Sequence, residues 1–259
     1  MGDIKDKISD ATGEVAGAVV AAGIGLAIPG PAGAVIGATF GAVFSNLSSD
    51  ILSRALSKKE KERIERVKEE TIKTIEENEK KGKTLRNDGF FTNTIKDRSS
   101  AEEIYEGILI ASQKEYEERK ILLLGRLYAN IAYDSSITRP IANTLIKEAS
   151  ELTYRQLMII KDIGILQITA AKGIDPRRND NSGVVRGVTN VSIASDITTL
   201  YHKTLVHSSS VILDAANINP ALLSLVGHGE LLFRLMELER TEIDDSEKDI
   251  MDFLTKNAE

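Results

Sequence analysis

The sequence predicts a mainly α-helical protein with one short β-hairpin, and three observations support this fold class. Apolar residues recur at intervals of three and four in the charged stretches, which is the spacing of one helix face. Serine or threonine precedes glutamate or glutamine by three residues at several helix starts. The chain of 259 residues holds only 5 prolines and 5% aromatic residues. We expect a Gly/Ala-rich hairpin over 1–50, a helical bundle over 51–150 and a winged-helix-like module over 151–259.

An uncharged run from Val15 to Ser49 dominates the first part, and small residues recur in it every four positions. Such spacing lines one stripe of a helix and lets a second backbone approach closely. The two stripes consist of Gly13, Gly17, Ala21 and Gly25, and of Gly33, Gly37, Gly41, Ser45 and Ser49. Between them lies the turn sequence Pro29, Gly30 and Pro31. We therefore predict two glycine-zipper helices joined by a Pro-Gly-Pro turn.

The environment of this hairpin stays open between three readings. Each helical glycine costs about 1 kcal/mol relative to alanine, so the run needs close packing to be helical. The segments 15–28 and 32–49 would form helices of about 21 and 27 Å, both shorter than a hydrocarbon core of about 30 Å. A conditional membrane element, a soluble buried or self-associating hairpin and a plain membrane anchor all remain possible. A leucine at Gly37 should overpack a zipper and abolish self-association, whereas a simple anchor would tolerate it.

The second part is expected to be a bundle of charged, amphipathic helices. A long helix over 51–83 carries a narrow apolar seam that includes Ile64, Val67 and Ile75. Asn87-Asp88-Gly89 breaks it, and Phe90-Phe91 is expected to plug the core rather than to bind a ligand. The doubled capping box of Ser99 and Ser100 then opens one helical pattern that continues to Ile131. Pro140, in a first turn, starts the next helix.

The third part follows the element order of a winged helix. Thr153 and Gln156 form a capping box ahead of an apolar helix, and the polar segment 173–190 is expected to be an exposed loop. In that loop, the adjacent pair Arg177-Arg178 is interpreted as solvated rather than as an anion site. A helix over 196–206, strands over 210–215 and 221–226, a helix over 230–238 and a short helix around Ile250 follow.

Charge argues against nucleic acid as a partner. The whole chain has a net charge of −6, and residues 146–259 hold 12 basic and 17 acidic residues, a balance of −5. A nucleic-acid binder would need a basic surface, so we expect the winged-helix-like module to contact protein instead.

No pattern of catalytic or metal-binding residues emerges from the sequence, and we expect neither an enzyme nor a bound cofactor. The glycine pattern lacks a Walker lysine, and no serine stands in G-x-S-x-G. With no cysteine, disulfides and thiolate ligands are excluded, which fits a cytoplasmic protein. Only three histidines are present, and His202 and His207 are too far apart along a helix to share a face well. The first residues, MGDIKDKISD, lack the positive region of a secretory signal.

Three segments carry a resemblance to a known type of protein: EEIYEGILIASQKEYEERKILLLGRLYANIAYD, ELTYRQLMII and GELLFRLMEL. Together they resemble bacterial helical proteins of the abortive-infection or phage-defence accessory type, which have a Gly/Ala-rich N-terminal segment. The resemblance implies a cytoplasmic protein whose N-terminal run acts on the inner membrane once triggered. No functional residue carries over from it.

Two hypotheses follow for the function. The first is a membrane-perturbing or pore-forming effector of bacterial defence, with itself, a protein partner and inner-membrane lipid as partners. The alternative is a soluble oligomeric interaction protein that uses the glycine hairpin as its self-association core. A third reading, a DNA-binding regulator, is disfavoured by the charge balance.

Overall fold

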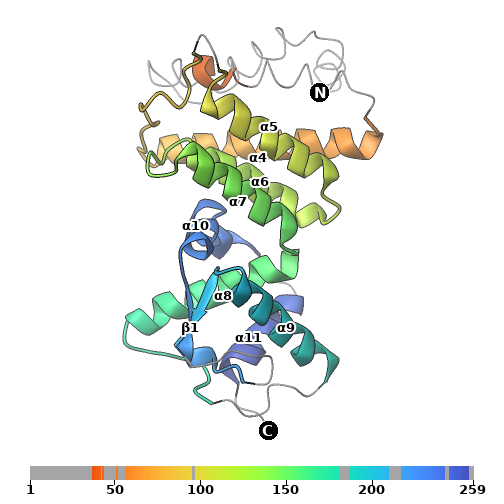
Figure 1. The fold of residues 1–259 in the computed structure, drawn as a ribbon, viewed down its shortest axis with the longest axis vertical. Coiled ribbons are helices and arrows are strands. Elements are labelled where there is room, and N and C mark those ends of the chain that lie inside the picture. Colours follow the sequence, from red (N-terminus) through yellow and green to blue (C-terminus); the bar gives the residue numbers. More distant parts are fainter. Residues whose placement is uncertain are drawn as a thin grey trace. The chain divides into compact units, whose positions relative to one another are not determined.

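The structure, a computed structural model, describes residues 37–41, 43, 51, 56–94, 97–180, 187–209, 217–242 and 245–256. These residues are mainly helical, with one small two-stranded sheet, which confirms the predicted fold class at that level (Figure 1). The chain divides into two compact units, Met1–Lys147 and Glu148–Glu259.

Helices α4 (Lys58–Lys80), α5 (Ser100–Lys114) and α6 (Glu118–Ile131) form the core of the first unit, and α4 packs against both of the others. The seam residues Ile64, Val67 and Ile75 are buried, as expected. The buried face is wider than that seam because α4 meets two helices, so Glu70 and Asn78 are buried as well.

Helices α4 and α6 cross closely at a glycine. A Cβ atom on Gly125 would lie 2.8 Å from the carbonyl oxygen of Val67, so only glycine lets the two backbones approach to this distance. The Thr71 hydroxyl lies in the crossing and donates to the Val67 carbonyl oxygen at 2.7 Å. The close crossing fixes α6, which carries Tyr128, against α4.

Two helix boundaries in this unit differ from the prediction. The long helix expected over 51–83 is wrong at its start, because Ser57 caps α4: its hydroxyl accepts from the Glu60 amide, and Glu60 accepts from the Ser57 amide. The single helix expected from Ser99 to Ile131 is wrong too, since α5 ends at Lys114. Glu115 takes an extended backbone there, with ψ at 123°.

The second unit contains α8 (Tyr154–Ala171), α9 (Val188–His202), β1 (Val206–Ser208), η1 (Pro220–Leu222), β2 (Leu223–Leu225), α10 (His228–Leu235), η2 (Leu238–Arg240) and α11 (Asp245–Thr255). α7 (Arg139–Glu151) contains the division between the units. The strands pair antiparallel, with Val206 opposite Leu225 and Ser208 opposite Leu223. Around them, α8 contacts β2, α9, α10 and α11.

The strand positions correct part of the prediction. The first strand is expected over 210–215, and all of these positions lie outside the described residues. The strand that the structure describes before β2 is Val206–Ser208. The sequence pattern places Val206 in the preceding helix, but α9 ends at His202, and Thr204 turns the chain with a φ of 57°. The second strand, Leu223–Leu225, lies inside the expected range.

The loop after α8 is anchored rather than solvated at Arg178. This side chain is buried, and its guanidinium carbon lies 5.5 Å from the ring centre of Phe253 on α11. The Arg178 amide also donates to the Leu254 carbonyl oxygen at 2.9 Å. Its neighbour Arg177 pairs with Asp175 and donates to the Leu223 carbonyl oxygen. Both arginines therefore hold the loop against its own unit.

Candidate functional site

The structure describes only part of the predicted glycine zipper. Gly37 and Gly41 are helical and buried. The remaining predicted positions lie outside the described residues; they are Gly13, Gly17, Ala21, Gly25, Gly33, Ser45 and Ser49, with the turn residues Pro29, Gly30 and Pro31. The zipper and its hairpin therefore stay predictions, and the site can be built only from the C-terminal end of the run.

At that end, one side of the helix is covered by protein. Gly37, Phe40 and Gly41 are spaced by three and four residues, which places them on one helix face, and all three are buried. Ala38, on another side, is exposed. Val43 is also buried. The end of the uncharged run thus presents an apolar face that the folded chain covers.

The phenyl ring of Phe40 enters a group of aromatic side chains from the helical bundle. Its centroid lies 5.5 Å from that of Phe91 and 6.3 Å from that of Tyr128, with an interplanar angle of 78° in both pairs. Phe90 meets Phe91 edge-on at 5.0 Å, and Tyr105 meets Tyr128 at 4.8 Å. We call these five side chains, Phe40, Phe90, Phe91, Tyr105 and Tyr128, the aromatic clasp. Edge-to-face pairs at such distances are favourable arrangements of aromatic rings.

Arg86 positions Phe90, one of the three phenylalanines of the clasp. Its buried guanidinium donates to the carbonyl oxygens of Ile131 and Ile137, at 3.3 and 2.9 Å, just beyond the C-terminal end of α6. It also pairs with Asp88 at 2.5 Å and lies 4.3 Å over the ring of Phe90. The hydrogen bond from Arg86 lowers the pKa of Asp88, so this carboxylate stays charged at neutral pH. One arginine therefore ties residues 86–90 to the end of α6.

The two tyrosines keep the clasp neutral. Burial raises the pKa of Tyr105 and of Tyr128 well above the usual tyrosine value, so both hydroxyls stay protonated. The Tyr128 hydroxyl donates to the Ala101 carbonyl oxygen at 3.4 Å, and the Ala101 amide donates to the Phe90 carbonyl oxygen at 2.9 Å. The part of the clasp that Tyr105 and Tyr128 form on α5 and α6 is thus an uncharged surface that suits an apolar partner.

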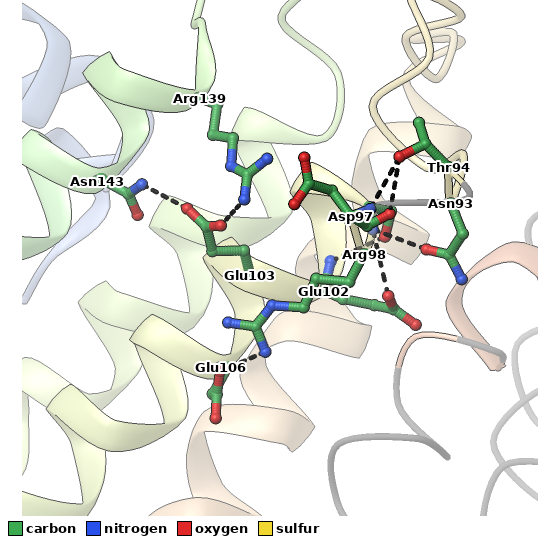
Figure 2. A network of polar contacts seen from close by, with 10 residues as sticks. Asn93, Thr94, Asp97, Arg98, Glu102, Glu103, Glu106, Arg139 and Asn143 are labelled. Carbon is green, nitrogen blue, oxygen red and sulfur yellow. Dashed lines mark hydrogen bonds and ion pairs between the residues drawn. The ribbon is translucent and has the colours of Figure 1, made fainter.

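A polar network follows the clasp along the chain, at the start of α5 (Figure 2). The Ser99 amide donates to Asn93 Oδ1 at 2.7 Å and to Glu102, whose own amide donates back to the Ser99 hydroxyl. The Asp97 amide donates to the Thr94 hydroxyl at 3.0 Å. These bonds form a turn that leads from Phe91 into the capped first turn of α5. Of the two serines in the predicted doubled box, only Ser99 acts as the cap.

The same network joins α5 to α7. Figure 2 shows Glu103 between Arg139, with which it forms an ion pair, and Asn143, whose amide donates to it at 2.7 Å. Arg98 pairs with Glu106 at 2.5 Å. The carboxylates of Glu102, Glu103 and Glu106 accept from nearby amides or pair with arginines, so these contacts support the fold.

The histidines are dispersed through the second unit. His228 Nδ1 lies 3.0 Å from Glu148, His207 is on β1 opposite Ser224, and His202 ends α9. Across the described ranges, no group of three or more His, Cys, Asp or Glu side chains could hold a metal ion. None of the described helices has the length and apolarity needed to cross a bilayer.

Comparisons of the chain with family models, with curated proteins and with solved structures find no match. The aromatic clasp is therefore interpreted from its own geometry. The sequence predicts that Phe90-Phe91 plugs the core, but it does not predict their contact with Phe40. The available signal was that Phe40 and Phe44 are the only aromatic residues in the uncharged run.

Proposed function

We propose that the protein is a non-enzymatic effector that perturbs or permeabilises membranes through its N-terminal uncharged run, in bacterial defence against phage. The observation that carries this proposal is the burial of Phe40 in the aromatic clasp, within a run of 35 residues without charge. A folded, charged bundle thus holds one end of a segment that has the composition of a weak membrane element. The defence context is supported only by the resemblance of the α5–α6, α8 and α10 sequences.

The free energy of docking the run onto the bundle is comparable to its free energy of insertion into lipid, which favours a run that moves between the two environments. Burying a phenylalanine side chain contributes roughly 1.5–3 kcal/mol, which is the scale of the docking that Phe40 provides. A run rich in alanine and glycine gains little per residue from lipid, so docking of that size competes with insertion. Once released, the predicted zipper would let copies of the run pack backbone to backbone in the membrane. We propose that the protein is cytoplasmic until this release and then associates with the inner membrane.

The second unit is proposed to receive the signal through a protein partner. We propose that its elements α8, α9, β1, β2 and α10 act as a winged-helix-like module whose helix before the first strand, α9, contacts the partner. In α9 the exposed residues include Val188, Thr189 and Ser195, and no lysine or arginine lies on this helix. Such a surface suits protein rather than a phosphate backbone.

The test uses the full-length protein and vesicles with and without anionic lipid. Wild type should float with vesicles and release an entrapped dye under conditions that loosen the bundle, such as mild urea. The double substitution Ala21→Glu and Val35→Glu should abolish both effects, because each charge costs about 2.5–3.5 kcal/mol at the centre of a bilayer.

Tyr116→Glu is the matched control, since this side chain is 77% exposed and lies outside the run. It adds a negative charge without touching the proposed membrane element and should leave flotation unchanged. Absence of flotation and leakage by wild type under every condition would rule the effector function out.

A second candidate is a soluble oligomeric interaction protein whose hairpin is its self-association core. The burial of Gly37 and Gly41 within the folded chain also supports this candidate, because a soluble hairpin has to cover its apolar face. This candidate expects no vesicle binding and a defined oligomer by light scattering. In it, the two charges of Ala21→Glu and Val35→Glu would dissociate the oligomer.

A further inference from the structure

We propose that the aromatic clasp is an autoinhibitory latch, in which Phe91 on the segment between α4 and α5 is the movable part that keeps the N-terminal run docked. This inference rests on the proposed function and names the contact that regulates it. It concerns Phe40, Phe91 and Arg86, all of them described residues.

The two sides of the Phe40 contact differ in how they are supported. Tyr128 projects from α6, which is fixed by its close crossing with α4 at Gly125. Phe91 lies in an irregular segment outside any helix and is only half-buried. The helix side of the contact is therefore a fixed surface, and the Phe91 side is a cover that can open without unfolding the bundle.

The side chain of Arg86 helps to hold the cover, in addition to the backbone bond from the Ala101 amide to the Phe90 carbonyl oxygen. Its guanidinium bonds to Ile131 and Ile137, and it also lies over Phe90, whose ring meets Phe91. Because this one side chain contacts both the end of α6 and Phe90, whose ring meets Phe91, loss of the arginine would weaken the support of both phenylalanines. The surrounding residues Asn87, Asp88 and Gly89 are exposed, so a partner can reach the segment while the latch is closed.

Substitution of the cover tests the latch directly. In Phe91→Ala, amide hydrogen exchange of residues 37–43 should become roughly tenfold faster, the effect of losing an aromatic pair and its buried area. Exchange within α4 and α6 should stay unchanged. Arg86→Ala should act in the same direction. The control is Tyr116→Ala, which removes an equally large but exposed aromatic side chain and should change neither region.

A reversible cross-link provides the second measurement. The chain has no cysteine, so Phe40→Cys with Phe91→Cys introduces one reactive pair, and the parent rings are 5.5 Å apart. A short maleimide cross-linker with a reducible spacer should join the two positions in high yield within one molecule. The linked protein should not bind vesicles, and reduction of the spacer should restore binding to the level of Phe91→Ala. Each single cysteine variant should fail to form the link.

The outcomes separate the latch from the proposed function. Unchanged exchange in Phe91→Ala, or failure of the cysteine pair to link, would overturn the latch whatever the membrane assays give. Faster exchange and an efficient link without any vesicle binding would uphold the contact as the clamp on the run and refute the effector function. Faster exchange together with stronger vesicle binding supports both.

Discussion

The ammonium group of Lys120 lies 2.5 Å from the carboxylate of Glu115, and the two side chains are only 2% and 6% exposed. The pair sits where α5 ends and α6 begins. Glu115 also accepts a hydrogen bond from the Glu117 amide at 2.8 Å. Its carboxylate therefore holds both the backbone between α5 and α6 and the ammonium group of Lys120. A buried ion pair thus defines the turn between two helices.

Removal of one member of this pair should be strongly destabilising. Glu115→Ala leaves the Lys120 charge buried and should lower the free energy of unfolding by about 3–5 kcal/mol. The double substitution Glu115→Leu and Lys120→Met removes both charges and should recover much of that loss. Urea denaturation followed by circular dichroism measures both values.

A surface pair serves as the control for this experiment. Lys58 and Glu62 approach to 3.8 Å on α4 with largely exposed side chains, so Glu62→Ala should cost less than about 1 kcal/mol. Equal effects of Glu115→Ala and Glu62→Ala would mean that burial does not determine the strength of the Glu115–Lys120 interaction.

A second prediction concerns the second unit, where α10 begins against the end of the α9–β1 turn. A Cβ atom on Gly229 would lie 1.9 Å from the Leu205 carbonyl oxygen, which is part of the backbone and cannot rotate away. Gly229→Ala should therefore displace α10. It should lower the free energy of unfolding of this unit by about 1–3 kcal/mol or more, the scale of overpacking, and its thermal midpoint should fall accordingly. Differential scanning calorimetry detects it.

Gly82→Ala is the comparison for Gly229→Ala. Gly82 has a φ of +74° and nothing within 4 Å of an added Cβ, so only the left-handed backbone is strained. We expect a cost of about 1–2 kcal/mol. A smaller effect of Gly229→Ala than of Gly82→Ala would contradict the contact with Leu205.

A third prediction follows from the buried tyrosines. Burial raises the pKa of Tyr128 above its usual 10.0, so the folded protein keeps a proton that the unfolded chain releases in alkali. A raised pKa contributes stability fully below about pH 10, and that contribution is lost as pH increases further. The urea midpoint should therefore fall steeply between about pH 10 and pH 12.

In Tyr128→Phe, the unfolding free energy should fall less steeply with pH, and the difference in slope should correspond to about one proton. At neutral pH the variant should lose at most about 1 kcal/mol, because the hydroxyl makes a long hydrogen bond of 3.4 Å to Ala101. Parallel alkaline slopes for wild type and Tyr128→Phe would show that this tyrosine ionises without unfolding. The exposed Tyr116 provides the control, since Tyr116→Phe should leave the slope unchanged.

Helix starts could be predicted from the sequence where the residues that determine the start lie within a few positions of it. The capping boxes of Ser99 and Thr153 appear in the structure at the expected residues, because a side chain and an amide three residues apart are sufficient to form them. The break at Glu115 was not predictable, since the apolar spacing continues through it and the cause is a buried pair with Lys120. Val206 was misassigned for a similar reason: its apolar position fits the α9 pattern, and pairing with Leu225 decides its conformation.

The candidate site was predictable only in part. The stripe of small residues is visible in the sequence, and the burial of Gly37 and Gly41 agrees with a packed face. Which surface packs there could not be deduced, because Phe91 and Tyr128 are distant in sequence and the folding of α4 and α6 brings them to Phe40.

The last prediction returns to Gly37, which is buried on the same helix face as Phe40. Gly37→Leu should overpack this face by about 1–3 kcal/mol, and it should also obstruct the backbone approach of the predicted zipper. Leucine is at the same time a better helix former and more hydrophobic than glycine. In the effector model, the variant should therefore float with vesicles more readily than wild type but fail to self-associate, release dye or cause toxicity on expression.

This separation of binding from leakage distinguishes a zipper from an anchor. A simple lipid anchor gains from leucine in every assay, so flotation and dye release would rise together. A soluble self-association core would lose its oligomer in Gly37→Leu without binding vesicles at all. Gly41→Leu, one stripe position further along the run, should repeat the effect of Gly37→Leu, whereas Ala38→Leu, on the exposed side, should preserve self-association. Unchanged oligomeric state and activity in both glycine variants would mean that the four-residue spacing is accidental.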